Sequence, residues 1–101
     1  MDQQMALHEE IRIIEKLLSS DVKADLLVLF NENPRLTDDS AHVARTVGRT
    51  LRQIDNDLRD LIDIGLLFKK NIRGSERICY DRKRAKEIQK LIADQIKAKL
   101  D

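Results

Sequence analysis

Residues 47–67 read Val-Gly-Arg-Thr-Leu-Arg-Gln-Ile-Asp-Asn-Asp-Leu-Arg-Asp-Leu-Ile-Asp-Ile-Gly-Leu-Leu. Gly48 can end one helix in the left-handed conformation, Thr50 can cap the next helix, and Gly65 can stop that helix in turn. These three residues bracket a helix over residues 51–64. Leucine and isoleucine recur inside it at helical spacing, so one face is apolar and the opposite face is polar.

Two amphipathic patterns precede this stretch. The first predicts a helix over residues 2–18 with a broad apolar stripe. Ser19 or Ser20 can then cap a second, strongly apolar helix over residues 21–31. This helix ends before Pro34, because the residue preceding a proline disfavours helical geometry. It is expected to be the central helix of the core.

A third, shorter helix is expected directly before the opening stretch. Thr37, Asp38 or Asp39 can cap it by accepting backbone N–H bonds, and we favour Asp39. The helix ends at Gly48, and Ala41 or Ala44, Val43 and Val47 are expected to be buried on its inner face.

After Gly65 the pattern changes to that of a β-hairpin. Residues 66–70 and 76–81 predict two short strands, joined by a loop over 71–75 that supplies the glycine hairpins need where φ is positive. A last amphipathic helix is expected over residues 83–100. Phe68, Ile78 and Tyr80 are expected to face the core, and Lys69, Arg77 and the loop to face solvent.

The order and spacing of these elements resemble the winged helix-turn-helix of ArsR-like, MarR-like and related archaeal and bacterial transcriptional regulators. The resemblance covers about residues 20–82 and rests on Ala44, the Val-Gly pair, the Thr50 cap, Gly-Leu-Leu and a basic hairpin that ends in Tyr80. It implies a mainly α fold with a small β-hairpin wing. In such proteins the helix equivalent to 51–64 enters the DNA major groove, and the wing touches the flanking backbone or minor groove.

Length and composition fit one winged-helix domain over residues 1–101, with an N-terminal helix (1–19), a core (20–82) and a C-terminal helix (83–101). No run of apolar residues is long enough to span a membrane, and the amino terminus does not resemble a secretory signal. We therefore expect a soluble, cytoplasmic protein. The single cysteine excludes an intramolecular disulfide.

The small net charge of +1 conceals an uneven distribution. Residues 1–65 hold eight Lys or Arg and thirteen Asp or Glu, which gives −5. Residues 66–90 hold nine Lys or Arg and three Asp or Glu, which gives +6. The positive charge therefore lies on the expected hairpin and the start of the last helix, as is typical of a nucleic-acid-binding surface.

Three side chains on the early turns of helix 51–64 have the chemistry to read bases. Arginine forms paired hydrogen bonds with guanine, and glutamine or asparagine does so with adenine. The expected base contacts are Arg52, Gln53 and Asn56. The expected contacts with the DNA backbone, including those of the wing, are Arg49, Thr50, Arg59, Lys69, Lys70, Arg73 and Arg77.

The same helix carries four aspartates, and a carboxylate that faces phosphate is repulsive. Asp57, Asp60 and Asp63 can point sideways toward cations elsewhere, whereas Asp55 is expected close to the groove. An acidic helix is also compatible with a second hypothesis, a winged-helix protein-interaction module that does not bind DNA. The DNA-binding and protein-interaction hypotheses differ in whether the helix and the wing form one continuous positive face.

No enzymatic or metal-dependent function is expected. The sequence has no Gly-rich phosphate loop and no nucleophile with a plausible base. His8, His42 and Cys79 do not form the paired-cysteine or His/Asp sets of ArsR-type metal sensors, so neither a metal nor another cofactor is predicted.

A winged-helix core of three helices does not need the two terminal helices to close it. We expect them to pack against those of a second chain in a homodimer, although packing on each other within one chain is the alternative. A two-fold dimer would place its recognition helices about 34 Å apart, one turn of duplex DNA, on a near-palindromic site. The expected interface residues are Leu7, Ile11, Ile14, Leu18, Ile88, Ile92 and Ile96.

Overall fold

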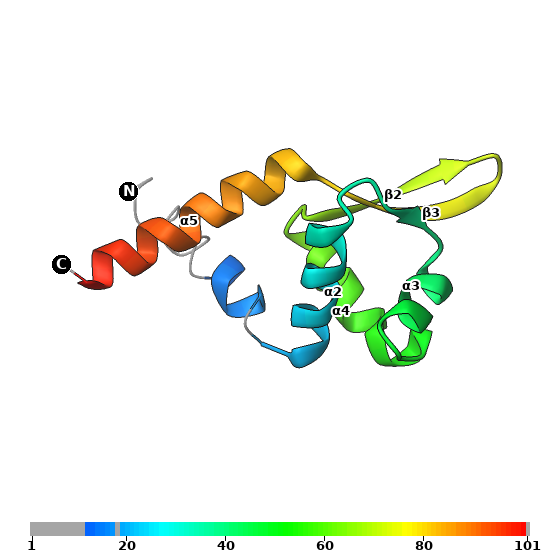
Figure 1. Cartoon of the computed structure of the whole chain (residues 1–101), viewed down its shortest axis with the longest axis horizontal. Helices are drawn as coiled ribbons and strands as arrows, with labels where there is room; N and C mark the ends of the chain where they lie inside the picture. The colour runs from blue at the N-terminus through cyan, green and yellow to red at the C-terminus, as the bar shows by residue number, and fades with distance from the viewer. Residues whose placement is uncertain (1–11, 18, 101) are drawn as a thin grey trace.

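The computed structural model of the chain describes residues 12–17 and 19–100. A helical segment over 12–17 precedes the other helices and strands, most of which are labelled in Figure 1. These elements are α2 (Asp21–Glu32), β1 (Thr37–Asp38), α3 (Ser40–Thr46), α4 (Leu51–Asp63), β2 (Leu67–Ile72), β3 (Ser75–Tyr80) and α5 (Arg82–Leu100). Most of the expected N-terminal helix, with Leu7, Ile11 and Leu18, lies outside the described residues.

Helices α2 and α3 begin at side chains that capping rules favour. Ser20 accepts a hydrogen bond from the backbone N–H of Lys23 at the start of α2, and Asp39 accepts one from His42 at the start of α3. The preference for Asp39 over its two neighbours is therefore confirmed. Each bond satisfies a backbone donor that has no partner within the helix.

The turn between α3 and α4 depends on a glycine. Gly48 has φ of +73°, which disfavours any residue with a Cβ atom, and it lets the chain reverse between the two helices. Helix α3 itself ends at Thr46, two residues earlier than expected. Gly65, at φ of +85°, ends α4 in the same conformation. Thr50 caps α4, which ends one residue before the expected limit.

The sheet contains a strand that the sequence pattern did not reveal. Its order is β1-β3-β2, with all neighbours antiparallel, and Thr37 and Asp38 pair with Cys79 and Ile78. The hairpin turn is also tighter than the expected five-residue loop, because β2 and β3 continue to Ile72 and Ser75. Only Arg73 and Gly74 connect them, with φ of +53° and +82°.

The expected inward orientation of Phe68 is wrong. Phe68 pairs with Cys79, whereas Ile78 pairs with Lys69, so Phe68 and Ile78 lie on opposite faces of the hairpin. Phe68 is 42% exposed, and Leu67, 2% exposed, takes the inward position. A shift of one residue in a strand moves every side chain to the other face. Lys69 consequently projects on the side of α4.

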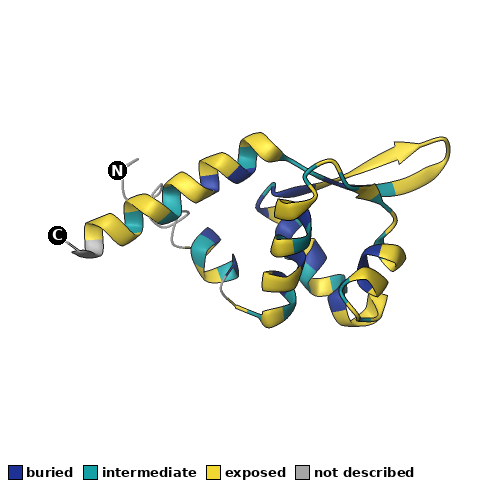
Figure 2. Cartoon of the chain, in the orientation of Figure 1, coloured by how far each residue is buried: buried dark blue, intermediate teal, exposed yellow. Residues whose placement is uncertain are grey.

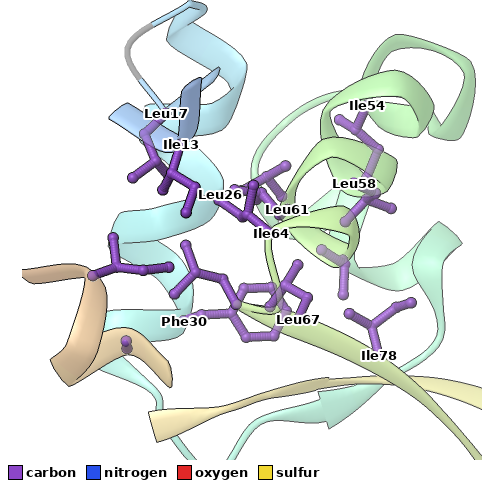
Figure 3. Close-up of a cluster of buried hydrophobic side chains, with 14 of the residues drawn as sticks. Ile13, Leu17, Leu26, Phe30, Ile54, Leu58, Leu61, Ile64, Leu67 and Ile78 are labelled. Carbon is purple, nitrogen blue, oxygen red and sulfur yellow. The ribbon is translucent and has the colours of Figure 1, made fainter. Parts of the chain in front are cut away.

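One aliphatic core joins α2, α4 and the sheet, as Figure 3 shows. Leu26 and Phe30 of α2 meet Ile54 and Leu61 of α4, and each of these four is at most 1% exposed. The ring of Phe30 also stacks on that of Tyr80, with centroids 6.0 Å apart. This core fixes α4 against α2 and the base of the hairpin. The arrangement is a winged helix-turn-helix. It is mostly helical, with a small three-stranded sheet that includes the hairpin wing.

Helix α5 leaves this core as it proceeds toward the carboxyl terminus (Figure 1). Its first turns are anchored by Ala85 and Ile88, which are buried in the core of the same chain. Ile88, expected at the interface with a second chain, is thus mostly buried within its own chain. Farther along, Ile92 is half-buried and Ile96 is 55% exposed. Figure 2 shows the change from buried to exposed residues along this helix.

Candidate nucleic-acid interface

The outward face of α4 carries a stripe of polar side chains. Arg52, Asn56 and Arg59 are exposed, while Ile54 and Leu58 are buried on the opposite face. The stripe follows from helical geometry, because residues three or four apart share a face. All three expected base-reading residues, Arg52, Gln53 and Asn56, are thus exposed on the first two turns.

Three of the four aspartates of α4 point away from this stripe. Lys23 of α2 is 4% exposed, and its ammonium nitrogen lies 2.6 Å from Asp60 and 3.7 Å from Asp57. The hydroxyl of Ser20 donates a hydrogen bond to Oδ1 of Asp57, at 2.7 Å. Lys16 lies 3.9 Å from Asp63. The expected sideways orientation of these three acids is confirmed, and their charge is balanced within the chain.

Asp55 behaves differently from the other acids of α4. Its Oδ2 lies 3.0 Å from Nη2 of Arg59 on the next turn, and both side chains are substantially exposed. The pair belongs to the outward face, so the stripe comprises Arg52, Asp55, Asn56 and Arg59. Its formal charge is positive.

The first turn of α4 is closed by a reciprocal pair of hydrogen bonds. Thr50 Oγ1 accepts from the backbone N–H of Gln53, and Gln53 Oε1 accepts from that of Thr50 at 2.9 Å. Both residues were expected to touch DNA, and both also stabilise the helix terminus. The Thr-x-x-Gln spacing is a known sequence signature of this capping box and could have revealed the second role.

Arg49 is directed toward α2. Its Nη2 donates to Oδ2 of Asp25 at 2.8 Å, and its buried Nε has no hydrogen-bond partner among the described residues. Arg49 therefore also helps to hold the turn between α3 and α4 against α2.

The cations of the wing fall into two groups. Lys69 lies 3.3 Å from Glu76 across the hairpin, and Arg77 lies 3.4 Å from Asp38. For Lys70 and Arg73, by contrast, no carboxylate partner is found in the described part of the chain. Both are exposed, and Arg73 occupies the hairpin tip. Among the four wing cations, Lys70 and Arg73 are therefore the two whose charge no carboxylate of the described residues balances.

Asp38 connects the sheet to α3. It contacts Arg77 of β3, Nδ1 of His42 in α3 and the backbone N–H of Asp39. Burial by itself would raise the pKa of Asp38. The hydrogen bonds from His42 and Asp39, with the nearby charges of His42 and Arg77, outweigh burial and lower that pKa below 3.8.

Helix α4 and the wing meet in one small cleft. Asp55 and Arg59 line it from α4, and Lys69 lines it from β2. Leu58, Ile62, Ile78 and Ser40 complete its walls. The polar stripe is therefore continuous with the base of the wing.

The two described soft ligands, His42 and Cys79, lie in separate surroundings. Cys79 is buried beside Thr37, His42 contacts Asp38, and His8 lies outside the described residues. Within residues 12–17 and 19–100, no group of three or more His, Cys, Asp or Glu side chains could hold a metal ion. Among the helices of the same residues, none has the length and apolar character required to cross a membrane.

Comparison with known proteins supports the fold. No protein-family model and no curated protein sequence matches this chain. Among solved structures, it is similar to the crystal structure of the AntR antimony-specific transcriptional repressor, with a TM-score of 0.61. The match covers 94% of this chain and 84% of that one, at 17% sequence identity. The fold is thus of a kind found in transcriptional regulators.

Proposed function

We propose that this protein is a dimeric, sequence-specific DNA-binding transcriptional regulator without enzymatic activity, acting in the cytoplasm. Helix α4 would lie in the major groove, where Arg52, Gln53 and Asn56 contact bases. The wing would lie on flanking backbone or in the minor groove.

The observation that carries this proposal is the stripe on α4. It is exposed, cationic on balance and continuous with Lys69 at the base of the wing. An α-helix fits the major groove, and guanidinium and amide groups match the hydrogen-bonding patterns of base edges there. The fold and the chemistry of the exposed side chains therefore support the same interface.

The arrangement of the aspartates favours DNA over a protein partner. A module that binds a basic protein would present the acids of α4 outward. Asp57 and Asp60 are instead bound to a buried lysine, and Asp63 lies beside Lys16. Two of the four acids of this helix, Asp57 and Asp60, are therefore turned toward a buried cation rather than toward a partner.

The wing would supply most of the contacts that do not depend on sequence. Lys70 and Arg73 are exposed, and an arginine at a hairpin tip can enter a narrow minor groove. Lys69 and Arg77 are near the same surface, and phosphate could replace Glu76 or Asp38 as their partner. Arg49 and Thr50 would contact backbone at the start of α4.

Homodimerisation is supported by exposed apolar residues on α2 and α5. Val28 and Ile96 are each 55% exposed, and Ile92 and Ile14 are half-buried. An apolar groove of about 240 Å³, lined by residues that include Leu17, Val28 and Ile92, lies between α2 and α5. A second chain packed there would remove this surface from water.

Binding of the purified protein to random-sequence duplex DNA across a salt series tests the proposal. Affinity should fall steeply with salt, because each neutralised phosphate adds about one unit to the slope of log K against log salt. Asn56→Ala should then relax preference at one base pair of a selected site by about 1–3 kcal/mol. Absence of any binding at low salt would reject DNA as the partner.

A further inference from the structure

Asp55 is the one acid of α4 on the face proposed to meet DNA. It lies one turn after Arg52 and one turn before Arg59, to which it is bound at 3.0 Å. The Asp55 side chain is 49% exposed and that of Arg59 is 70% exposed. A surface ion pair of this kind contributes little to stability, since solvent screens it and ordering two side chains costs entropy.

The position of Asp55 has a cost for DNA binding. Its carboxylate would repel the phosphates on either side of the groove, which lowers affinity for every sequence. Asp57 and Asp60 avoid this cost because they turn toward the buried Lys23 of α2, and Asp63 lies two turns farther along α4, beside Lys16. Asp55 must therefore contribute something other than affinity or stability if its presence on this face is useful.

The geometry of the pair shows what that contribution can be. One nitrogen of the Arg59 guanidinium is bound to Asp55, and both side chains line the cleft between α4 and the wing. A guanidinium has five N–H donors in a planar fork, so binding one carboxylate oxygen leaves others for a base edge. Held in one orientation, that fork can pair with O6 and N7 of guanine.

We propose that Asp55 is a positioning residue that orients Arg59 to read a guanine. Arg59 then specifies a base, rather than contacting phosphate as the sequence pattern suggested. This inference rests on the proposed DNA-binding function and adds a specificity-determining pair to it.

The test begins with selection of a preferred site for the unaltered protein from random duplexes. Affinity is then measured for that site, for its single-base-pair variants and for random DNA, using the unaltered chain and Asp55→Asn. Asp55→Asn should bind random DNA more tightly, because a repulsive charge is gone. It should lose about tenfold in discrimination at one G·C pair, because Arg59 is no longer oriented.

Three further variants separate orientation from charge. Arg59→Lys keeps the charge but lacks the planar fork, so it should lose discrimination at the same base pair with an unchanged salt slope. Asp55→Glu keeps a carboxylate and should retain most of the discrimination. Asp63→Asn removes an equal charge elsewhere on α4 and should leave every base preference unchanged.

The outcomes distinguish this inference from the function on which it rests. A protein that selects a site, but keeps the same discrimination at every position in Asp55→Asn, overturns the role of Asp55. Full retention of discrimination in Arg59→Lys overturns base reading by Arg59. Failure of the unaltered protein to bind DNA at all would reject the proposed function itself.

Discussion

At the scale of single residues, the buried ammonium group of Lys23 determines the electrostatic character of α4. It lies between α2 and α4 and contacts both Asp57 and Asp60. A buried charge is tolerated only when it is paired and hydrogen-bonded, and Ser19 provides a further acceptor at 2.6 Å. Lys23 thus attaches α4 to the core and keeps two carboxylates away from the exposed stripe.

Replacement of Lys23 by methionine should destabilise the protein strongly. The variant retains most of the side-chain volume but leaves Asp57 and Asp60 without their cation, which typically costs about 3–5 kcal/mol. The free energy of unfolding in urea measures this loss. Lys16→Met is the matched control, because the Lys16–Asp63 pair is more exposed and should contribute less than about 1 kcal/mol. Equal losses in the two variants would contradict the importance of burial at Lys23.

The pKa of Asp38 predicts a specific sensitivity to acid. Because the folded-state pKa lies below 3.8, ionised Asp38 stabilises the fold above that pH, and this stabilisation is lost as the pH falls through the lowered pKa. The free energy of unfolding should therefore decrease less steeply below pH 3.8 in Asp38→Asn than in the unaltered chain. Parallel pH profiles of the two proteins would show that the contacts of Asp38 do not favour its ionised form.

At the scale of elements, local signals predicted the helices because their ends depend on adjacent residues. Ser20, Asp39 and Thr50 are caps that contact the backbone within three residues, and Gly48 and Gly65 act at their own positions. Such interactions can be recognised from spacing alone. The positions of all the helices after residue 20 were consequently predicted to within two residues.

Features that depend on distant residues could not be predicted in this way. Strand β1 has two residues and forms because β3 lies beside it, so it has no periodicity of its own. The run Leu66-Leu67-Phe68 allows either residue 67 or residue 68 to face inward, and the alternation alone does not choose. Likewise, the Lys23–Asp60 contact joins residues far apart in sequence. The polar face of α4 and the sideways orientation of Asp57, Asp60 and Asp63 were predicted. Their partners Lys23 and Lys16, and the pairing of Asp55 with Arg59, required the structure.

The wing turn should show a conflict between stability and DNA binding. Arg73 has φ of +53°, a conformation that costs most residues about 1–2 kcal/mol but that asparagine adopts readily. Arg73→Asn should therefore raise the free energy of unfolding by about 1 kcal/mol while it weakens binding to all DNA sequences. Thermal unfolding and a salt series measure the two effects. Arg73→Lys keeps the charge and the backbone preference, so it should change neither the free energy of unfolding nor the affinity for DNA greatly. A loss of stability in Arg73→Asn would contradict the strain at this turn.

At the scale of the whole molecule, the surface proposed to bind DNA and the surface proposed to bind a second chain lie in different parts of the structure. The described residues extend over 46 × 26 × 22 Å, with the wing toward one end and the carboxyl-terminal part of α5 toward the other (Figure 1). Exposed cations lie on α4 and the wing and also along α5, whereas Val28 and Ile96 expose apolar surface on α2 and α5. A second chain bound through α5 would therefore leave both DNA-binding surfaces free.

Disruption of the proposed dimer should weaken binding to DNA without altering α4. Ile96→Asp places a charge on an exposed position of α5, where it should prevent burial against a second chain but spare the core of its own chain. We expect the mass in solution to fall from that of two chains to that of one, with an unchanged far-ultraviolet circular dichroism spectrum.

Ile72→Asp, on the exposed part of the wing, makes the same chemical change and should leave the dimer intact. Affinity for a palindromic site should fall in Ile96→Asp while a single half-site is bound as before, because linking two modules raises affinity without changing either contact surface. If Ile96→Asp remained dimeric, the second chain would have to bind elsewhere, and the spacing of about 34 Å between recognition helices would no longer be expected.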